Sequence, residues 1–235
     1  MEEKSPRRGY AETDERDFSL GSLNALRKAQ EEIHWLLDRG YPIGNAATFV
    51  CNRYLFSARQ RIALTRATAQ TGLIEQRKAK EVSDCKGEVV SIDGLNLIIT
   101  LEVALSGSVL IKCMDGTVRD LAGLRGTYRL IDKTDAAIAL IGDKLKSMGV
   151  AGADFYLDAP VSNTGRLKVR MLELLAGYGY GVRVELVKNV DAVLKAKPCV
   201  ATSDGGILDE CTSWTNMASA LISESVSCAK LVDLA

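Results

Sequence analysis

The sequence predicts an α/β protein with a small helical domain first and a larger domain built on a mostly parallel sheet after it. Helical periodicity and capping signals dominate up to about residue 69. Beyond residue 88, short apolar segments typical of buried strands alternate with helical segments, the pattern of a three-layer α/β/α domain. Three of these strands end on an aspartate, which places acidic groups at one edge of the sheet.

The composition is that of an ordinary soluble protein. Lys+Arg and Asp+Glu each number 30, so the formal net charge of the 235-residue chain is zero and bulk attraction to nucleic acid is not indicated. The chain is 47% hydrophobic and 26% charged. No apolar run reaches the roughly 18 residues of a membrane span, and the charged N-terminus does not resemble a secretory signal. We therefore expect a cytoplasmic protein with no membrane partner.

Residues 19–69 are expected to form a compact domain of three short helices. Apolar residues at helical spacing predict the first helix up to Leu37, and Gly40 supplies its stop. A second helix is expected at about 45–51, and a capping box at Ser57 predicts the start of the third. The turn between the last two is compatible with a helix-turn-helix whose arginines contact phosphates. A solvated helix face explains the same arginines.

Two polar segments are expected to lie outside these domains. Residues 1–18 are charged and are predicted to be frayed or disordered. Residues 70–87 are rich in lysine and acids and are interpreted as a linker. The α/β domain then covers residues 88–235.

In the α/β domain, the predicted strands and helices follow one another along the chain. Asp115-Gly116 is a strong turn signal, so residues 117–130 are expected to continue as a hairpin or a lid. Strands are expected at 89–93, 108–113, 155–158, 182–187, 199–204 and 230–234, and helices at 97–105, 134–148, 164–176 and from 191.

Four aspartates are predicted to share one edge of the sheet. Asp93, Asp158 and Asp204 end strands, and Asp191 starts a helix directly after another strand. Any one of them could be a helix N-cap, but the set indicates more, because clustered like charges repel unless a cation lies among them. Oxygen-only ligands suit Mg²⁺ or Mn²⁺. Such sites activate water and stabilise a leaving oxygen of a phosphate ester.

Histidine and cysteine chemistry is disfavoured. His34 is the single histidine, which argues against a Ser-His-Asp triad, a Cys-His pair or a multi-histidine zinc site. The six cysteines show no C-x-x-C spacing and are interpreted as buried free thiols. Catalysis would then rest on carboxylates, hydroxyls, lysine or a metal.

The acidic strand ends resemble the NYN branch of the PIN-like nuclease superfamily. The similarity covers roughly residues 88–235 as four short motifs in the family's order: Asp93-Gly94-Leu95-Asn96, Leu157-Asp158-Ala159, Val190-Asp191 and Thr202-Ser203-Asp204. The whole chain, including 37–42 and 52–54, is similar to an uncharacterised, largely archaeal family that joins a helical domain of unknown function to a PIN-like domain. The insertion at 115–133 departs from a minimal NYN domain.

The resemblance implies a metal-dependent ribonuclease acting on RNA. Asp93, Asp158 and Asp204 would bind Mg²⁺ or Mn²⁺, with Asp191 as a further ligand or a water-orienting base. Asn96 and Ser203 would orient carboxylates or a phosphate oxygen. A local phosphate-binding rim, or alternatively a charged solvated loop, would be formed by Arg119, Arg125, Arg129, Lys133 and Arg166.

Two other functions compete with this one. A haloacid-dehalogenase-like phosphatase also binds Mg²⁺ at strand ends, but its nucleophile strand ends Asp-x-Asp, and Leu95 stands at the second position here. A non-catalytic nucleic-acid-binding or scaffold protein could carry a degenerate PIN-like site. The sequence leaves the oligomeric state open, a homodimer included.

Overall fold

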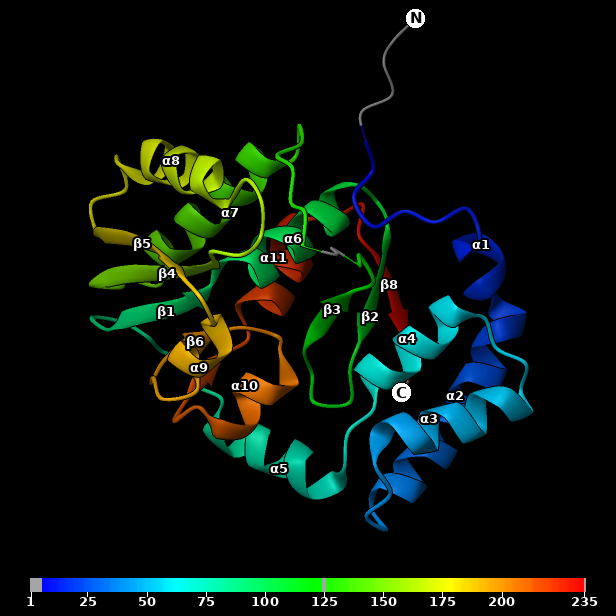
Figure 1. The fold of residues 1–235 in the computed structure, drawn as a ribbon. Coiled ribbons are helices and arrows are strands. Elements are labelled where there is room, and N and C mark those ends of the chain that lie inside the picture. The colour runs from blue at the N-terminus through cyan, green and yellow to red at the C-terminus, as the bar shows by residue number, and fades with distance from the viewer. Residues whose placement is uncertain (1–5, 124–125, 235) are drawn as a thin grey trace, which may run out of the picture.

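The computed structural model describes residues 6–123 and 126–234 as a mixed α/β fold (Figure 1). The helices are α1 (Asp14–Asp17), α2 (Leu20–Leu37), α3 (Ile43–Arg53), α4 (Ala58–Ala67), α5 (Thr71–Lys80), α6 (Gly94–Leu105), α7 (Thr134–Ser147), α8 (Thr164–Leu175), α9 (Val190–Leu194), α10 (Gly205–Glu210) and α11 (Met217–Ser225). The strands are β1 (Val89–Asp93), β2 (Val109–Lys112), β3 (Val118–Asp120), β4 (Gly152–Asp158), β5 (Gly181–Val187), β6 (Val200–Ala201), β7 (Trp214–Thr215) and β8 (Lys230–Asp233).

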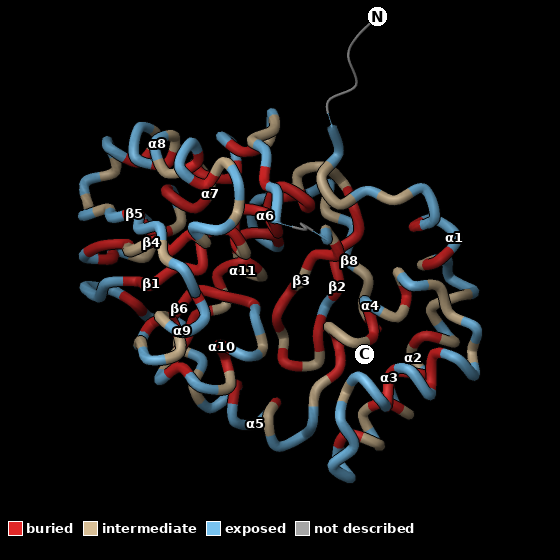
Figure 2. The backbone as a smooth tube through the Cα atoms, viewed as in Figure 1, coloured by how far each residue is buried: buried red, intermediate tan, exposed pale blue. Residues whose placement is uncertain are grey.

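The main sheet is parallel and places β1 between β4 and β6. Its strand order is β5-β4-β1-β6-β7. Helices pack on both faces, because successive strand residues point to opposite sides: Phe155 belongs to the hydrophobic cluster with α6, α7, α8 and α11, and Tyr156 to the cluster with α9 and α10. β1, β4, β6 and β7 are buried along most of their length, whereas Val184 is the one buried residue of the edge strand β5 (Figure 2). The predicted parallel α/β sheet is therefore present.

A second sheet, of order β3-β2-β8, corrects the expectation that all strands belong to one sheet. The hairpin predicted at Asp115-Gly116 joins β2 to β3, and β8 pairs with β2 in parallel. Alternation along β2 explains its position: Leu110 faces the core of the main sheet, whereas Val109 and Ile111 face the helical domain. This sheet therefore lies between the main sheet and the helices α2, α3 and α4, and it contributes residues to the hydrophobic core of each.

The N-terminal segment predicted to be frayed is ordered from residue 6. Arg8 forms an ion pair of 2.8 Å with the fully buried Glu102 of α6. Asp14 in α1 pairs with Arg59 of α4 at 2.8 Å. Charged residues thus fix this segment to the molecule through partners distant in sequence, which a local charge pattern does not reveal. Residues 1–5 lie outside the described residues.

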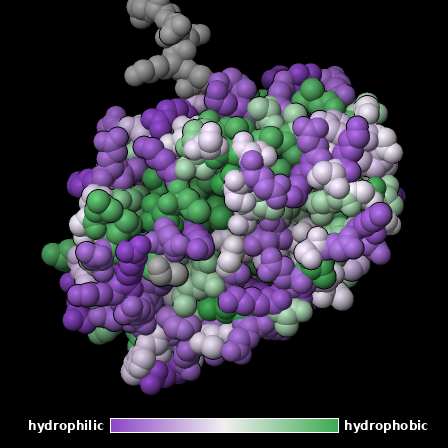
Figure 3. Space-filling model, turned by 180° about the vertical axis from the view of Figure 1, so that it is seen from behind, coloured by the Kyte–Doolittle hydropathy of each residue, from purple (hydrophilic) through white to green (hydrophobic). Residues whose placement is uncertain are grey.

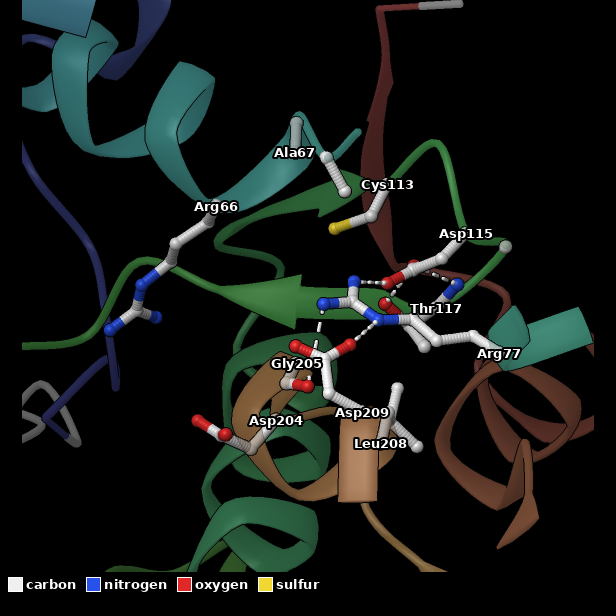
Figure 4. Close-up of polar contacts among 12 residues, drawn as sticks. Arg66, Ala67, Arg77, Cys113, Asp115, Thr117, Asp204, Gly205, Leu208 and Asp209 are labelled. Atoms are coloured by element: carbon white, nitrogen blue, oxygen red, sulfur yellow. Dashed lines mark hydrogen bonds and ion pairs between the residues drawn. The ribbon is translucent and has the colours of Figure 1, made fainter. Parts of the chain in front are cut away.

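The segment predicted as a linker, 70–87, contains the helix α5. Its Arg77 is only 5% exposed and forms ion pairs of 2.7 Å with Asp115 in the β2–β3 turn and with Asp209 in α10 (Figure 4). Trp214 donates its indole N–H to the carbonyl oxygen of Arg77. This polar helix is fixed because the charge of Arg77 is paired inside the protein.

No helix in the described parts of the chain is long and apolar enough to cross a membrane. Seen from behind, hydrophobic residues gather in a patch amid a largely hydrophilic surface (Figure 3). Single exposed hydrophobic residues such as Leu20, Phe49 and Leu55 also occur. Exposure of this kind is common on folded proteins.

Replacing Arg77 by alanine should destabilise the protein by about 3 kcal/mol, because Asp115 and Asp209 each lose a buried partner. Urea denaturation measures the loss. Arg61→Ala is the control, since its exposed hydrogen bond to Asn52 should be worth less than about 0.5 kcal/mol. Equal losses for the two variants would contradict a structural role for the Arg77 ion pairs.

Candidate active site

Asp93 occupies two structural positions at once: it ends β1 and is the N-cap of α6. One carboxylate oxygen accepts the backbone N–H of Asn96 at 3.4 Å, and the other accepts the hydroxyl of Thr202 at 2.9 Å. The following Gly94 is required by close packing, because a Cβ there would lie 2.6 Å from a methyl group of Leu157. The strand can therefore turn into a helix directly after the carboxylate.

The carboxyl group of Asp93 is buried, and its surroundings disfavour the charged form. It is only 7% exposed, and burial, helped by the nearby Asp204 and Asp158, raises its pKa to about 7 against the lowering effect of the Thr202 and Asn96 hydrogen bonds. At neutral pH the group is therefore close to half ionised. A cation placed beside it would favour the charged form.

Asp204 lies just beyond β6 and caps α10. Its Oδ1 accepts the backbone N–H groups of Gly206 at 2.8 Å and Ile207 at 3.3 Å. The Asp204 side chain is exposed, and no donor among the described residues is recorded for its second oxygen. Asp204 is thus an N-cap that also presents charge to Asp93.

Asn96 and Ser203, predicted to orient carboxylates or phosphate, bond to each other. The side-chain carbonyl of Asn96 accepts both the backbone N–H of Ser203 at 3.2 Å and its hydroxyl at 2.8 Å. This fixes α6 to the turn between β6 and α10. The residue that orients the Asp93 carboxylate is Thr202, which sequence reasoning assigned no role. Its place in the Thr202-Ser203-Asp204 motif was the available signal.

Asp158 and Asp191 form a second acidic pair. Burial and the charge of Asp191 raise the pKa of Asp158, while the backbone N–H of Val190 opposes this shift. Asp191 is exposed in the first turn of α9. The charges of Asp158 and Asp204 both act on Asp93, and the charge of Asp191 acts on Asp158. The four predicted acids therefore interact electrostatically at one edge of the sheet.

The three-carboxylate metal site is not formed by the side chains as they stand. Within residues 6–123 and 126–234, no group of three or more His, Cys, Asp or Glu side chains is arranged to hold a metal ion. Joint ligation by Asp93, Asp158 and Asp204 therefore stays a prediction.

One of the predicted basic residues lies beside the acids. Arg119 lines a pocket of about 350 Å³ together with Asn96, Ser203 and Asp204. The lining of that pocket does not include the other described members of the predicted rim, Arg129, Lys133 and Arg166. Arg125 lies outside the described residues.

Sequence comparisons assign the chain to a family. Residues 25–80 match a protein of unknown function (DUF434), and residues 82–220 match a domain of unknown function (DUF5616). The chain belongs to the DUF5616 family. In the DUF5616 protein the first match ends with α5, so residues 70–80 of the segment predicted as a linker fall within the DUF434 region, and residues 82–87 fall within the DUF5616 match.

A relative of this DUF5616 protein comes from an archaeon. An uncharacterized protein of Methanocaldococcus jannaschii, MJ0935, is 36% identical over 186 residues, which cover 78% of this chain and 89% of the relative. The expected uncharacterised family with archaeal members is therefore confirmed. No solved structure matches the chain.

The raised pKa of Asp93 predicts a pH-dependent stability in chelator. The unfolded carboxyl ionises near its ordinary pKa of 3.8 and the folded one near a pKa of about 7. Between these values the folded state binds more protons, so stability falls as pH rises through this window, by up to on the order of 4 kcal/mol. Asp93→Asn should remove this fall. Urea denaturation at several pH values measures the difference between the two proteins, and parallel curves would contradict the assigned environment.

Proposed function

We propose that this protein is a metal-dependent ribonuclease with a PIN-like, three-layer domain of the NYN type. The observation that carries the proposal is Asp93, a buried carboxyl at the end of a central parallel strand with its pKa raised by burial and by neighbouring acids. Ligands bind beyond the carboxyl ends of strands in such sheets. Carboxyl groups whose pKa is shifted by burial and by neighbouring charges are typical of functional sites.

The sheet order supports the resemblance to NYN nucleases. Its acidic motifs belong to three neighbouring strands, β4, β1 and β6, in that spatial order. Strands distant in the chain therefore bring Asp158, Asp93 and Asp204 to one edge. A chance scatter of aspartates over the strands would not favour adjacent positions.

The donor set fits a hard divalent cation. Carboxylate and hydroxyl oxygens dominate this edge, and Mg²⁺ in proteins often uses one or two carboxylates, with waters and a substrate phosphate completing the octahedron. Asp93 and Asp204 would hold the ion, with Asp158 on the other side of β1. When bound, the cation supplies activation of water and neutralisation of phosphate charge.

The surrounding residues perform the positioning. The Thr202 hydroxyl fixes the orientation of the Asp93 carboxylate. The Asn96–Ser203 hydrogen bonds hold the turn that carries Asp204. Asp191 is exposed and its charge acts on Asp158, so in this proposal it would accept a proton or orient an attacking water.

The structure weakens the phosphatase alternative. The segment from Asp204 to Asp209 resembles the paired late acids of such phosphatases, but the Asp209 carboxylate is bound by Arg77 at 2.7 Å. The non-catalytic alternative draws support from the lack of a three-acid metal group among the described residues, and the assay below separates it from the nuclease.

Purified protein is expected to cleave mixed RNAs with Mn²⁺ or Mg²⁺ and to lose cleavage in chelator. Asp93→Asn should lower the rate on the order of 100-fold or more, because it removes a carboxylate ligand. Asp84→Asn is the matched control, since Asp84 is an exposed residue whose carboxylate bonds only locally to Lys86.

Two results would count against the proposal. Cleavage that survives chelation, or that Asp93→Asn leaves intact, would rule out the metal mechanism. No cleavage of any RNA, together with tight metal-independent binding, would favour the non-catalytic function.

A further inference from the structure

The pocket beside the acidic edge has one wall from the helical domain. Arg66 of α4 and Arg119 of β3 line it together with Asn96, Ser203 and Asp204. Figure 4 shows Arg66 and Asp204 extending from different elements, α4 and the start of α10. A guanidinium and the acidic edge therefore share one pocket, although their residues belong to different domains.

A second pocket extends this one along the domain boundary. It measures about 460 Å³, shares Arg66 and Arg119 with the first, and is also lined by Gly205, Gln70 and Tyr41. Tyr41 is 55% exposed, so much of an aromatic residue is accessible there. We call the two pockets together the interdomain groove.

We propose that the interdomain groove binds single-stranded RNA, with Arg66 of the helical domain holding a backbone phosphate next to the acidic edge. The RNA class rests on the proposed function, whereas the phosphate subsite rests on the groove itself. Arginine forms bidentate bonds to phosphate. Single strands are bound by cationic grooves that also offer aromatic rings for stacking, which Tyr41 supplies.

Arg66 is the most exposed arginine of the groove: its side chain is 40% exposed, against 15% for Arg119 and 6% for Arg77. Its guanidinium lies 3.6 Å from the carboxylate of Asp120 and also donates to the Asp120 carbonyl. The Asp120 carboxylate is shared, because Thr100 and the backbone N–H of Ala122 also donate to it. Arginine carries five N–H donors, so Arg66 can bind a phosphate without breaking these contacts.

Arg119 holds Arg66 in place. It donates to the carbonyl of Arg66 at 2.7 Å and to the carboxylate of Asp115 at 2.9 Å. Although burial alone would raise the pKa of Asp115, the Arg119 and Arg77 charges and the Thr117 hydrogen bonds hold it below its usual value. Asp115 therefore stays ionised and keeps Arg119 fixed, which makes Arg119 a positioning residue and Arg66 the contact.

The strand is expected to be unpaired, because a base must leave its stack to lie against Tyr41. Asp93 is only 7% exposed, so a flexible single strand would approach it more closely than a rigid duplex. Because the protein has no net charge, binding should be modest and depend on few phosphates.

The test is fluorescence anisotropy with a labelled single-stranded uridine 12-mer, in chelator so that no metal-dependent cleavage occurs. Wild-type protein should bind, Arg66→Gln should bind at least about fivefold more weakly, and its log K against log salt slope should be smaller by about 0.7. Arg66→Lys should recover part of the affinity. Arg61→Gln removes the same charge from the same helix outside the groove and should change affinity less than about twofold.

The proposal is overturned if Arg66→Gln and Arg61→Gln behave alike, if wild type does not bind, or if a duplex of the same length binds as tightly as the single strand. Loss of binding in Arg66→Gln with no cleavage by any protein variant would support the subsite while refuting the nuclease. Metal-dependent cleavage of RNA, together with unchanged binding by Arg66→Gln, would support the nuclease while refuting the Arg66 phosphate subsite.

Discussion

Burial of the Asp93 carboxylate at the end of a central strand costs desolvation free energy, and the groups around Asp93 decide how much of that cost is compensated. Removing a charge from water is unfavourable unless hydrogen bonds or an opposite charge compensate. Thr202 and the first turn of α6 supply two hydrogen bonds, but Asp204 and Asp158 add like charge. A divalent cation beside Asp93 would provide the remaining compensation, which is the physical basis of the proposed metal site.

A second set of charges joins the domains. Asp115, in the turn of the β2–β3 hairpin, binds Arg77 from α5 and Arg119 from β3, and Arg77 binds Asp209 in α10. The helix that carries Arg77 and the helix that begins at Asp204 are thereby fixed to the same hairpin. The ion pairs that hold the domains together thus also shape the groove leading to the acidic edge.

Most elements of the α/β domain could be predicted because strand hydrophobicity and capping chemistry are local, whereas the two-residue strand β7 was not anticipated. The hairpin at Asp115 and the turn after Asp93 follow from their own residues. Membership of β8 in a second sheet could not be predicted, because periodicity does not say which strand is the neighbour.

The features that could not be predicted from the sequence depend on ion pairs between residues far apart in the chain. Arg77 meets partners 38 and 132 residues away, so its segment resembled a linker. The four acids were predictable from strand ends, and Thr202 only from its motif. Arg66 could not be distinguished from a solvated helix arginine, because its importance depends on the hairpin packed beside it.

The most direct test of the central claim, that the acidic edge is a divalent metal site, is anomalous diffraction from crystals grown with Mn²⁺. The account predicts a manganese peak about 2 Å from a carboxylate oxygen of Asp93, with Asp204 or Asp158 as a further ligand, and loss of that peak in Asp93→Asn crystals. A peak only at other carboxylates, or none at this edge with Mn²⁺ present in excess, would contradict it.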